Sequence, residues 1–157
     1  MSNFWIGAVL ILAALQTACS SGEAIGTKRM LGDRWLWTDS LVIDYQHNRQ
    51  DVQQDLMLVL QTTDDYPFRN LYLRLWVNQD SVAPQSSLHN FIINDVEGYW
   101  YAERSFWSST YQMELPIACN LKLRNGQKLQ FSLVHQLRTD TLPGVREVGL
   151  AWRPSSE

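Results

Sequence analysis

Apolar and polar residues alternate along most of the chain after residue 35. This period of two places successive side chains on opposite faces of an extended strand, and helical heptads are absent. Five stretches show the alternation most clearly, with these positions on one face: Leu41, Ile43 and Tyr45; Leu56, Leu58 and Leu60; Leu71, Leu73, Leu75 and Val77; Leu129, Phe131, Leu133, His135 and Leu137; Val148, Leu150 and Trp152. Shorter stretches lie at residues 35–37, 88–93, 99–101 and 113–117. The pattern predicts about eight or nine short strands.

Residues suited to turns separate these stretches, at 64–67, 78–80, 94–98, 125–126 and 142–144. The pair Asn125-Gly126 is the strongest hairpin signal. Strands with one apolar face each must bury those faces against one another. The sequence therefore predicts an all-β domain folded as an antiparallel β-sandwich, with a partly closed β-barrel as the alternative.

The N-terminal segment differs from the rest of the chain. Residues 4–15 are an apolar run, and no Lys, Arg, Asp or Glu precedes Cys19. As a helix the run would extend about 18 Å, which is less than the hydrocarbon core of a bilayer, about 30 Å. Such a run is typical of a secretory signal. The residues that follow it, Leu15-Gln16-Thr17-Ala18-Cys19, resemble a bacterial lipobox.

A lipobox predicts that residues 1–18 are a signal peptide and that Cys19 becomes the N-terminal residue. Its sulfur would carry a diacylglyceryl group and its amine a fatty acyl group such as palmitate, which together give lasting membrane attachment. Two alternatives stay open: a plain secretory signal, with Cys19 kept and paired with Cys119, or an uncleaved anchor. Residues 19–32 are small and polar after the cysteine and predict a flexible tether. Residues 33–157 are expected to form one domain.

Charge and composition exclude several classes of function. The net charge is −3 and no basic stripe is present, so nucleic acid is not an expected partner. The three histidines lack metal-ligand spacing, and neither HExxH nor G-x-S-x-G occurs. The carboxylate pairs Asp64-Asp65 and Asp95/Glu97 lie in turns, where backbone hydrogen bonding is their ordinary role. The neighbours of Cys119 indicate a small buried side chain. We therefore expect no catalytic residue, metal or cofactor, and no enzyme.

One segment, residues 99–107, is rich in aromatic side chains and contains an arginine. These residue types are enriched at interaction hot spots. The alternative interpretation is that some of these rings close one end of the sandwich. The candidate contact residues are Trp100, Tyr101, Arg104, Phe106 and Trp107.

Three motifs resemble the GldH family of gliding-motility lipoproteins of the Bacteroidetes. They are Tyr66-Pro67-Phe68-Arg69-Asn70-Leu71-Tyr72-Leu73, then the segment from Asp95 to Trp100, then the segment from His135 to Gly149. The resemblance spans residues 35–152. It implies a lipoprotein of the cell envelope, expected at the outer membrane, that is associated with the type IX secretion apparatus and has no assigned enzymatic activity.

Two functions from different classes follow as hypotheses. The first is a lipid-anchored accessory or structural subunit that binds other envelope proteins of a gliding-motility or type IX secretion assembly, with its membrane contact through Cys19. The second is a surface glycan-binding module, in which exposed coplanar aromatic rings form the platform. The first predicts partner contacts that are lost on mutation, and the second predicts sugar binding by the purified protein.

Overall fold

The computed structural model describes residues 22–80, 82–105 and 107–155. The elements in chain order are β1 (Glu23–Arg29), η1 (Leu31–Asp33), β2 (Arg34–Leu36), β3 (Leu41–Gln46), β4 (Val52–Thr63), β5 (Asn70–Gln79), β6 (Val82–Ile92), β7 (Glu103–Arg104), β8 (Thr110–Leu123), β9 (Lys128–His135), β10 (Thr141–Pro143) and β11 (Val145–Pro154). The described residues contain no α-helix, so the all-β prediction is confirmed. They also contain no helix long and apolar enough to cross a membrane.

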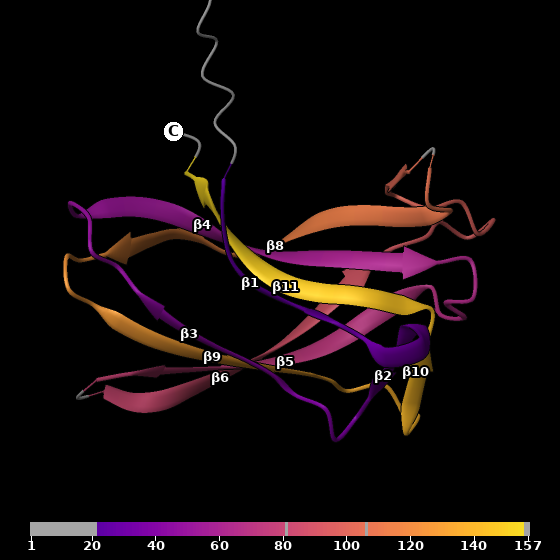
Figure 1. Ribbon diagram of the computed structural model, residues 1–157, viewed down its shortest axis with the longest axis horizontal. Helices are drawn as coiled ribbons and strands as arrows, with labels where there is room; N and C mark the ends of the chain where they lie inside the picture. The colour runs from indigo at the N-terminus through magenta and orange to yellow at the C-terminus, as the bar shows by residue number, and fades with distance from the viewer. Residues whose placement is uncertain (1–21, 81, 106, 156–157) are drawn as a thin grey trace, which may run out of the picture.

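Two antiparallel sheets face each other (Figure 1). One has the strand order β1-β11-β4-β8-β7, and the other has the order β3-β9-β5-β6. β2 and β10 form a separate ribbon at one end of the molecule. The two large sheets share no strand in the described part of the chain. The predicted antiparallel β-sandwich is therefore confirmed over the closed alternative.

The core lies between the two sheets and is formed by the inward faces that the alternation predicts. These six inward positions are buried as expected: Leu71, Leu73, Leu75, Leu129, Phe131 and Leu133. Trp152 of β11 is also fully buried, and its ring lies 6.1 Å from that of Phe131 and 5.7 Å from that of Tyr45. Burial of each large apolar side chain contributes about 1.5–3 kcal/mol, so these strands hold the two sheets together.

β1 lies in the region where the composition indicates a tether. It pairs with β11 from Glu23 to Arg29. Its small residues permit close approach: a Cβ on Gly26 would lie 2.9 Å from the side chain of Ile43, and a Cβ on Gly149 would lie 2.5 Å from the Gly26 carbonyl oxygen. Glycine at such contacts is typical of closely packed strands, and a tether has the same composition. The structure thus differs from the expectation over residues 23–29.

Cys119 is exposed, which corrects the buried position indicated by its neighbours. The pairing of β4 with β8 is irregular here, and Asp55 stands opposite both Cys119 and Asn120. Two residues opposite one form a β-bulge. Asn120 has a φ of 55°, and its amide donates to the Asp55 carboxylate at 2.8 Å. The bulge shifts the alternation, so Cys119 faces solvent.

The second half of the chain also differs from the prediction in three further places. β9 ends at His135, two residues before Leu137, the last position of the predicted alternation. The predicted turn at 142–144 contains most of β10, in which Leu142 pairs with Trp35 of β2. Residues 99–101 contribute only an isolated bridge between Trp100 and Asn94 instead of a full strand. Ribbons this short depend on tertiary contacts, which local patterns do not reveal.

Candidate interaction surface

The aromatic segment begins in a tight loop that Asp95 organises. One carboxylate oxygen of Asp95 accepts hydrogen bonds from the amides of Glu97 and Tyr99, at 3.0 and 2.8 Å. The Asp95 amide donates to the Tyr99 carbonyl at 2.9 Å, and Gly98 supplies a φ of 89°, which an L side chain rarely adopts. Asp95 thus has the backbone role expected of a turn carboxylate, and the loop fixes the direction of the rings that follow it.

Trp100 points inward and closes one end of the sandwich. Its ring stacks on Tyr111 of β8, with centroids 4.4 Å apart and an interplanar angle of 11°. The Tyr66 ring meets the Trp100 ring at an interplanar angle of 61°, with the ring centroids 6.1 Å apart. Trp100 is half-buried and packs against the core. Of the two roles expected for this segment, Trp100 takes the one in the core.

A charged layer covers the outer side of this ring stack. Tyr111 donates its hydroxyl proton to Asp64 at 2.8 Å, and the Arg104 guanidinium lies 5.8 Å from the centre of the Tyr111 ring. Arg104 also reaches Asp64, with 3.7 Å between nitrogen and oxygen. The hydrogen bond to Asp64, together with burial, raises the pKa of Tyr111. These contacts place Arg104 over the Tyr111 ring and beside Asp64.

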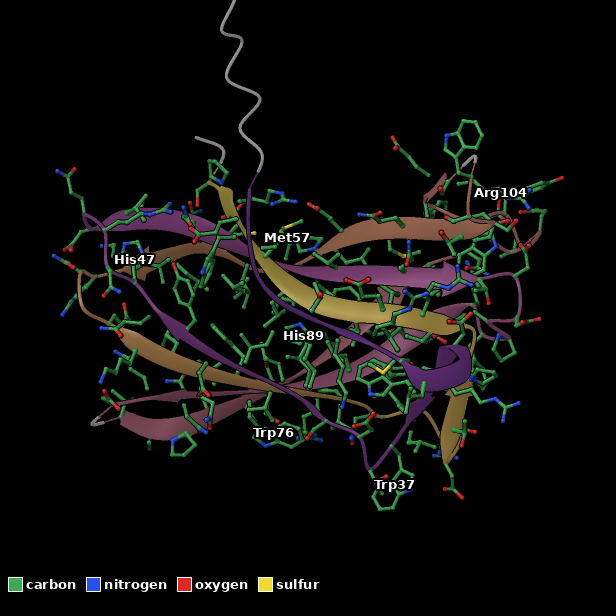
Figure 2. The ribbon with its side chains drawn as sticks, viewed as in Figure 1. Trp37, His47, Met57, Trp76, His89 and Arg104 are labelled. Carbon is green, nitrogen blue, oxygen red and sulfur yellow. The ribbon has the colours of Figure 1, made fainter. Side chains whose placement is uncertain are left out.

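Three other side chains of the segment face solvent: Tyr99 is 73% exposed, Tyr101 62% and Trp107 91%. With Arg104, they form what we call the aromatic end, which lies at the opposite end of the molecule from His47 (Figure 2). A shallow depression of about 520 Å³ lies beside Tyr101 and Arg104, over β7 and β8.

The structure divides the residues that the sequence analysis singled out. Tyr101, Arg104 and Trp107 are exposed, Trp100 is half-buried, and Phe106 and Cys19 lie outside the described residues. The contacts of Asp64 and Tyr111 with Arg104 are not indicated by the sequence. Asp64 was visible only as a turn carboxylate, and Tyr111 lies 47 positions further along the chain.

The three motifs that carry the family resemblance meet around Tyr66. Tyr66 is buried, its hydroxyl donates to the Asn70 carbonyl at 2.9 Å, and burial raises its pKa. Its ring contacts Trp100 of the second motif. Gly144 of the third motif lies so close that a Cβ there would be 2.2 Å from the Tyr66 amide nitrogen. The motifs are therefore parts of one structural joint that supports the aromatic end.

The same joint includes an ion pair that the sequence analysis did not identify. Arg146 donates to both carboxylate oxygens of Asp33, at 2.8 to 3.2 Å. This hydrogen bonding is the largest cause of the lowered pKa of Asp33. Arg138 and Asp140 lie two residues apart in the same motif, but no ion pair joins them in the structure, where both are described.

Two of the three histidines, His135 and His47, are buried and bonded within the fold. His135 is buried as predicted, with Nε2 3.1 Å from the Trp35 carbonyl oxygen, and burial lowers its pKa. His47 is buried between the Tyr45 hydroxyl, at 3.2 Å, and the Gln50 carbonyl oxygen, at 2.9 Å. Among the residues of the three described ranges, no group of three or more His, Cys, Asp or Glu side chains is placed to hold a metal ion.

Fold and surface together define the class: a small antiparallel β-sandwich with three exposed aromatic residues, Tyr99, Tyr101 and Trp107, in one segment at its end. Within this class the chain belongs to the GldH lipoprotein family, whose model matches residues 26–151. The family identifies it as a gliding-motility-associated lipoprotein of the cell envelope, anchored to a membrane.

Other comparisons add little to this identification. A comparison with curated proteins gives no match. Among solved structures, the functional form of the mosquito-larvicidal Cry4Aa toxin from Bacillus thuringiensis aligns with a TM-score of 0.42 and 11% sequence identity. That alignment covers 87% of this chain and 22% of the toxin chain.

Proposed function

We propose that the protein is a lipid-anchored accessory subunit of a gliding-motility or type IX secretion assembly at the outer membrane, and that it acts by contact and not by catalysis. The single observation that carries this proposal is the aromatic end, in which exposed Tyr99, Tyr101 and Trp107 accompany Arg104, and Arg104 lies over the ring of Tyr111. Aromatic and arginine side chains dominate the binding energy of protein interfaces.

The position of the anchor supports the same function. Cys19 precedes Glu23 by four residues, so a lipid on it holds the start of β1 within about 14 Å of the bilayer surface. Glu23 pairs with Trp152, which pairs with Leu56, and Leu56 lies seven residues before Thr63 at the aromatic end of β4. Seven residues of an antiparallel strand, at about 3.4 Å each, span roughly 24 Å. The aromatic end is thus well separated from the anchoring point.

The glycan-binding alternative has less support. It needs open, coplanar rings, but Trp100 and Tyr111 stack on each other, so the faces that meet are closed to a sugar. By contrast, most of the side-chain surface of Tyr101 and Trp107 is exposed to solvent, and a protein partner can bury that surface.

Site-specific crosslinking in native membranes tests the proposal. A photoreactive aromatic residue replaces Tyr101, or replaces the exposed Trp37 in a matched control, and captured proteins are identified by mass spectrometry. We expect envelope proteins to be captured from position 101 and not from position 37. Equal capture from both positions, or binding of purified protein to a glycan array without protein capture, would contradict the contact role.

A further inference from the structure

An apolar cavity lies between the two sheets, on the side where β6 and β8 form the edges. Its volume is about 400 Å³, within the range of small-molecule sites, about 300–1,000 Å³. Apolar side chains from both sheets line it, among them Leu56, Leu75, Ile117, Leu121, Phe131 and Trp152. His89 points from β6 into the space between the sheets (Figure 2).

The cavity exists because this side of the sandwich is not covered by a further strand. β7 pairs with β8 only at Tyr111 and Gln112, and β6 is the last described strand of its sheet. Ile117 and Leu121 of β8 are consequently only half-buried, although they face the core. Covering the exposed part of these side chains with an apolar ligand removes apolar surface from water, which is favourable.

The rim of the cavity is polar and has one sign of charge. Gln79, Gln85, Ser87 and His89 contribute hydrogen-bonding groups, and the Ser87 hydroxyl lies 2.7 Å from Nε2 of His89. Lys122 is the one Lys or Arg among the residues described as lining the cavity, and no Asp or Glu lines it. An apolar interior with a cationic rim complements a ligand that has an apolar tail and an anionic head.

We propose that this cavity binds one long-chain fatty acid, with its acyl chain between the sheets and its carboxylate at Lys122. A methylene group has about the volume of a water molecule, about 30 Å³, so 400 Å³ holds roughly 13 of them. That is one acyl chain, whereas a diacyl phospholipid has two. The site is separate from the aromatic end, and its occupancy is independent of the proposed function.

A β-strand from a partner protein fits the opening less well. Strand addition needs main-chain donors along the free edge, and Pro84 of β6 has none. Apolar side chains of an added strand would also meet Gln85 and Ser87 at the edge of β6, which line the cavity with polar groups. These observations favour a lipid tail over a peptide.

The test uses the mature full chain, extracted from membranes and transferred into amphipol. Palmitic acid with a mid-chain diazirine is added, the sample is irradiated, and labelled residues are mapped by mass spectrometry. We expect label on β8 and β9 residues that line the cavity, with competition by unlabelled palmitate. Label only on exposed residues outside the cavity, no label, or crosslinks from the cavity to a co-purified protein segment would overturn the proposal.

Two variants separate cavity binding from surface adsorption. Leu121→Trp fills the cavity and should reduce labelling at least about tenfold, whereas Val42→Trp, on the exposed face of β3, should leave it unchanged. Lys122→Glu, a change at an exposed position, should weaken labelling by the acid about tenfold or more but spare labelling by the matching alcohol. The lysine variant decides the result if Leu121→Trp does not fold. Unchanged labelling of Lys122→Glu by the acid, or equal loss with acid and alcohol, would contradict the assigned head-group site.

Discussion

At the scale of single residues, the joint behind the aromatic end depends on Gly144 and on the Asp33–Arg146 pair. Gly144 has a φ of 75° and touches the backbone of Tyr66, and its carbonyl oxygen accepts the Thr63 amide at 2.8 Å. Arg146 links the same segment to Asp33, which follows β1 in the chain. These contacts join parts of the chain that are far apart in sequence.

Gly144→Ala should destabilise the domain strongly. The new Cβ would meet the Tyr66 amide nitrogen, and both the positive φ and the overlap are unfavourable, by about 1–2 and 1–3 kcal/mol respectively. Gly126→Ala is the matched control, because Gly126 has a similar φ of 78° but nothing within 4 Å of the added Cβ. Urea unfolding of the two variants compares them. Similar losses of unfolding free energy would contradict the close contact at Gly144.

Asp33→Asn should change how stability depends on pH. Arg146 holds the folded-state pKa of Asp33 below its ordinary value of 3.8, so the pair stabilises the fold above that value and is lost as pH falls through the lowered pKa. The wild type should therefore exceed the variant in unfolding free energy at pH 7, by an amount that shrinks as pH falls below about 4. A difference that stays constant over that range would rule out this linkage.

At the scale of elements, the period-two pattern was sufficient for the strands that bury one face. β3, β4, β5, β9 and β11 all occur where Leu, Ile, Phe and Trp alternate with polar residues. The pattern failed where a strand has few large apolar residues, as in β1, or where a bulge shifts the alternation, as at Cys119. Which rings of the aromatic segment face inward was also undetermined, because the partner of Trp100 is the distant Tyr111.

Leu73→Ala should cost about 2–5 kcal/mol of unfolding free energy, through lost burial and the cavity left behind. Its neighbour on the opposite face, Arg74, lies 5.9 Å from the centre of the Trp76 ring, so Arg74→Ala should cost about 1 kcal/mol or less. Chemical denaturation of the two variants measures the difference. Equal losses would show that the two faces of β5 are assigned wrongly.

At the scale of the whole molecule, the proposed lipid anchor and the aromatic end lie at different places on the domain. β1 begins only four residues after Cys19 and is paired along β11, so the domain is held close to its predicted point of attachment. The aromatic end lies at the end of the sandwich where β4 ends and β11 begins (Figure 1). An anchor raises the local concentration of the domain, which favours contact with neighbouring envelope proteins.

Cys19 should carry lipid and be the first residue of the mature chain. The observation behind this prediction is the apolar run that ends in Thr17-Ala18-Cys19. Mass spectrometry of the membrane-extracted protein measures both features. Cys19→Ser should leave the protein without lipid and release it from the membrane fraction or stop its processing. An unmodified Cys19, or a different mature N-terminus, would refute the anchor.

The central claim is that the protein works by contact through its aromatic end, and the most direct test is partner capture by a double variant in cells. Tyr101→Ala with Trp107→Ala removes two exposed rings, and hot-spot residues of this kind contribute about 2 kcal/mol or more each, roughly 30-fold in affinity. We expect crosslinked partner yield and gliding to fall sharply, while circular dichroism and membrane attachment match the wild type. Trp37→Ala, at an exposed ring outside the aromatic end, should retain both. Full partner capture and normal gliding by the folded, anchored double variant would contradict the claim.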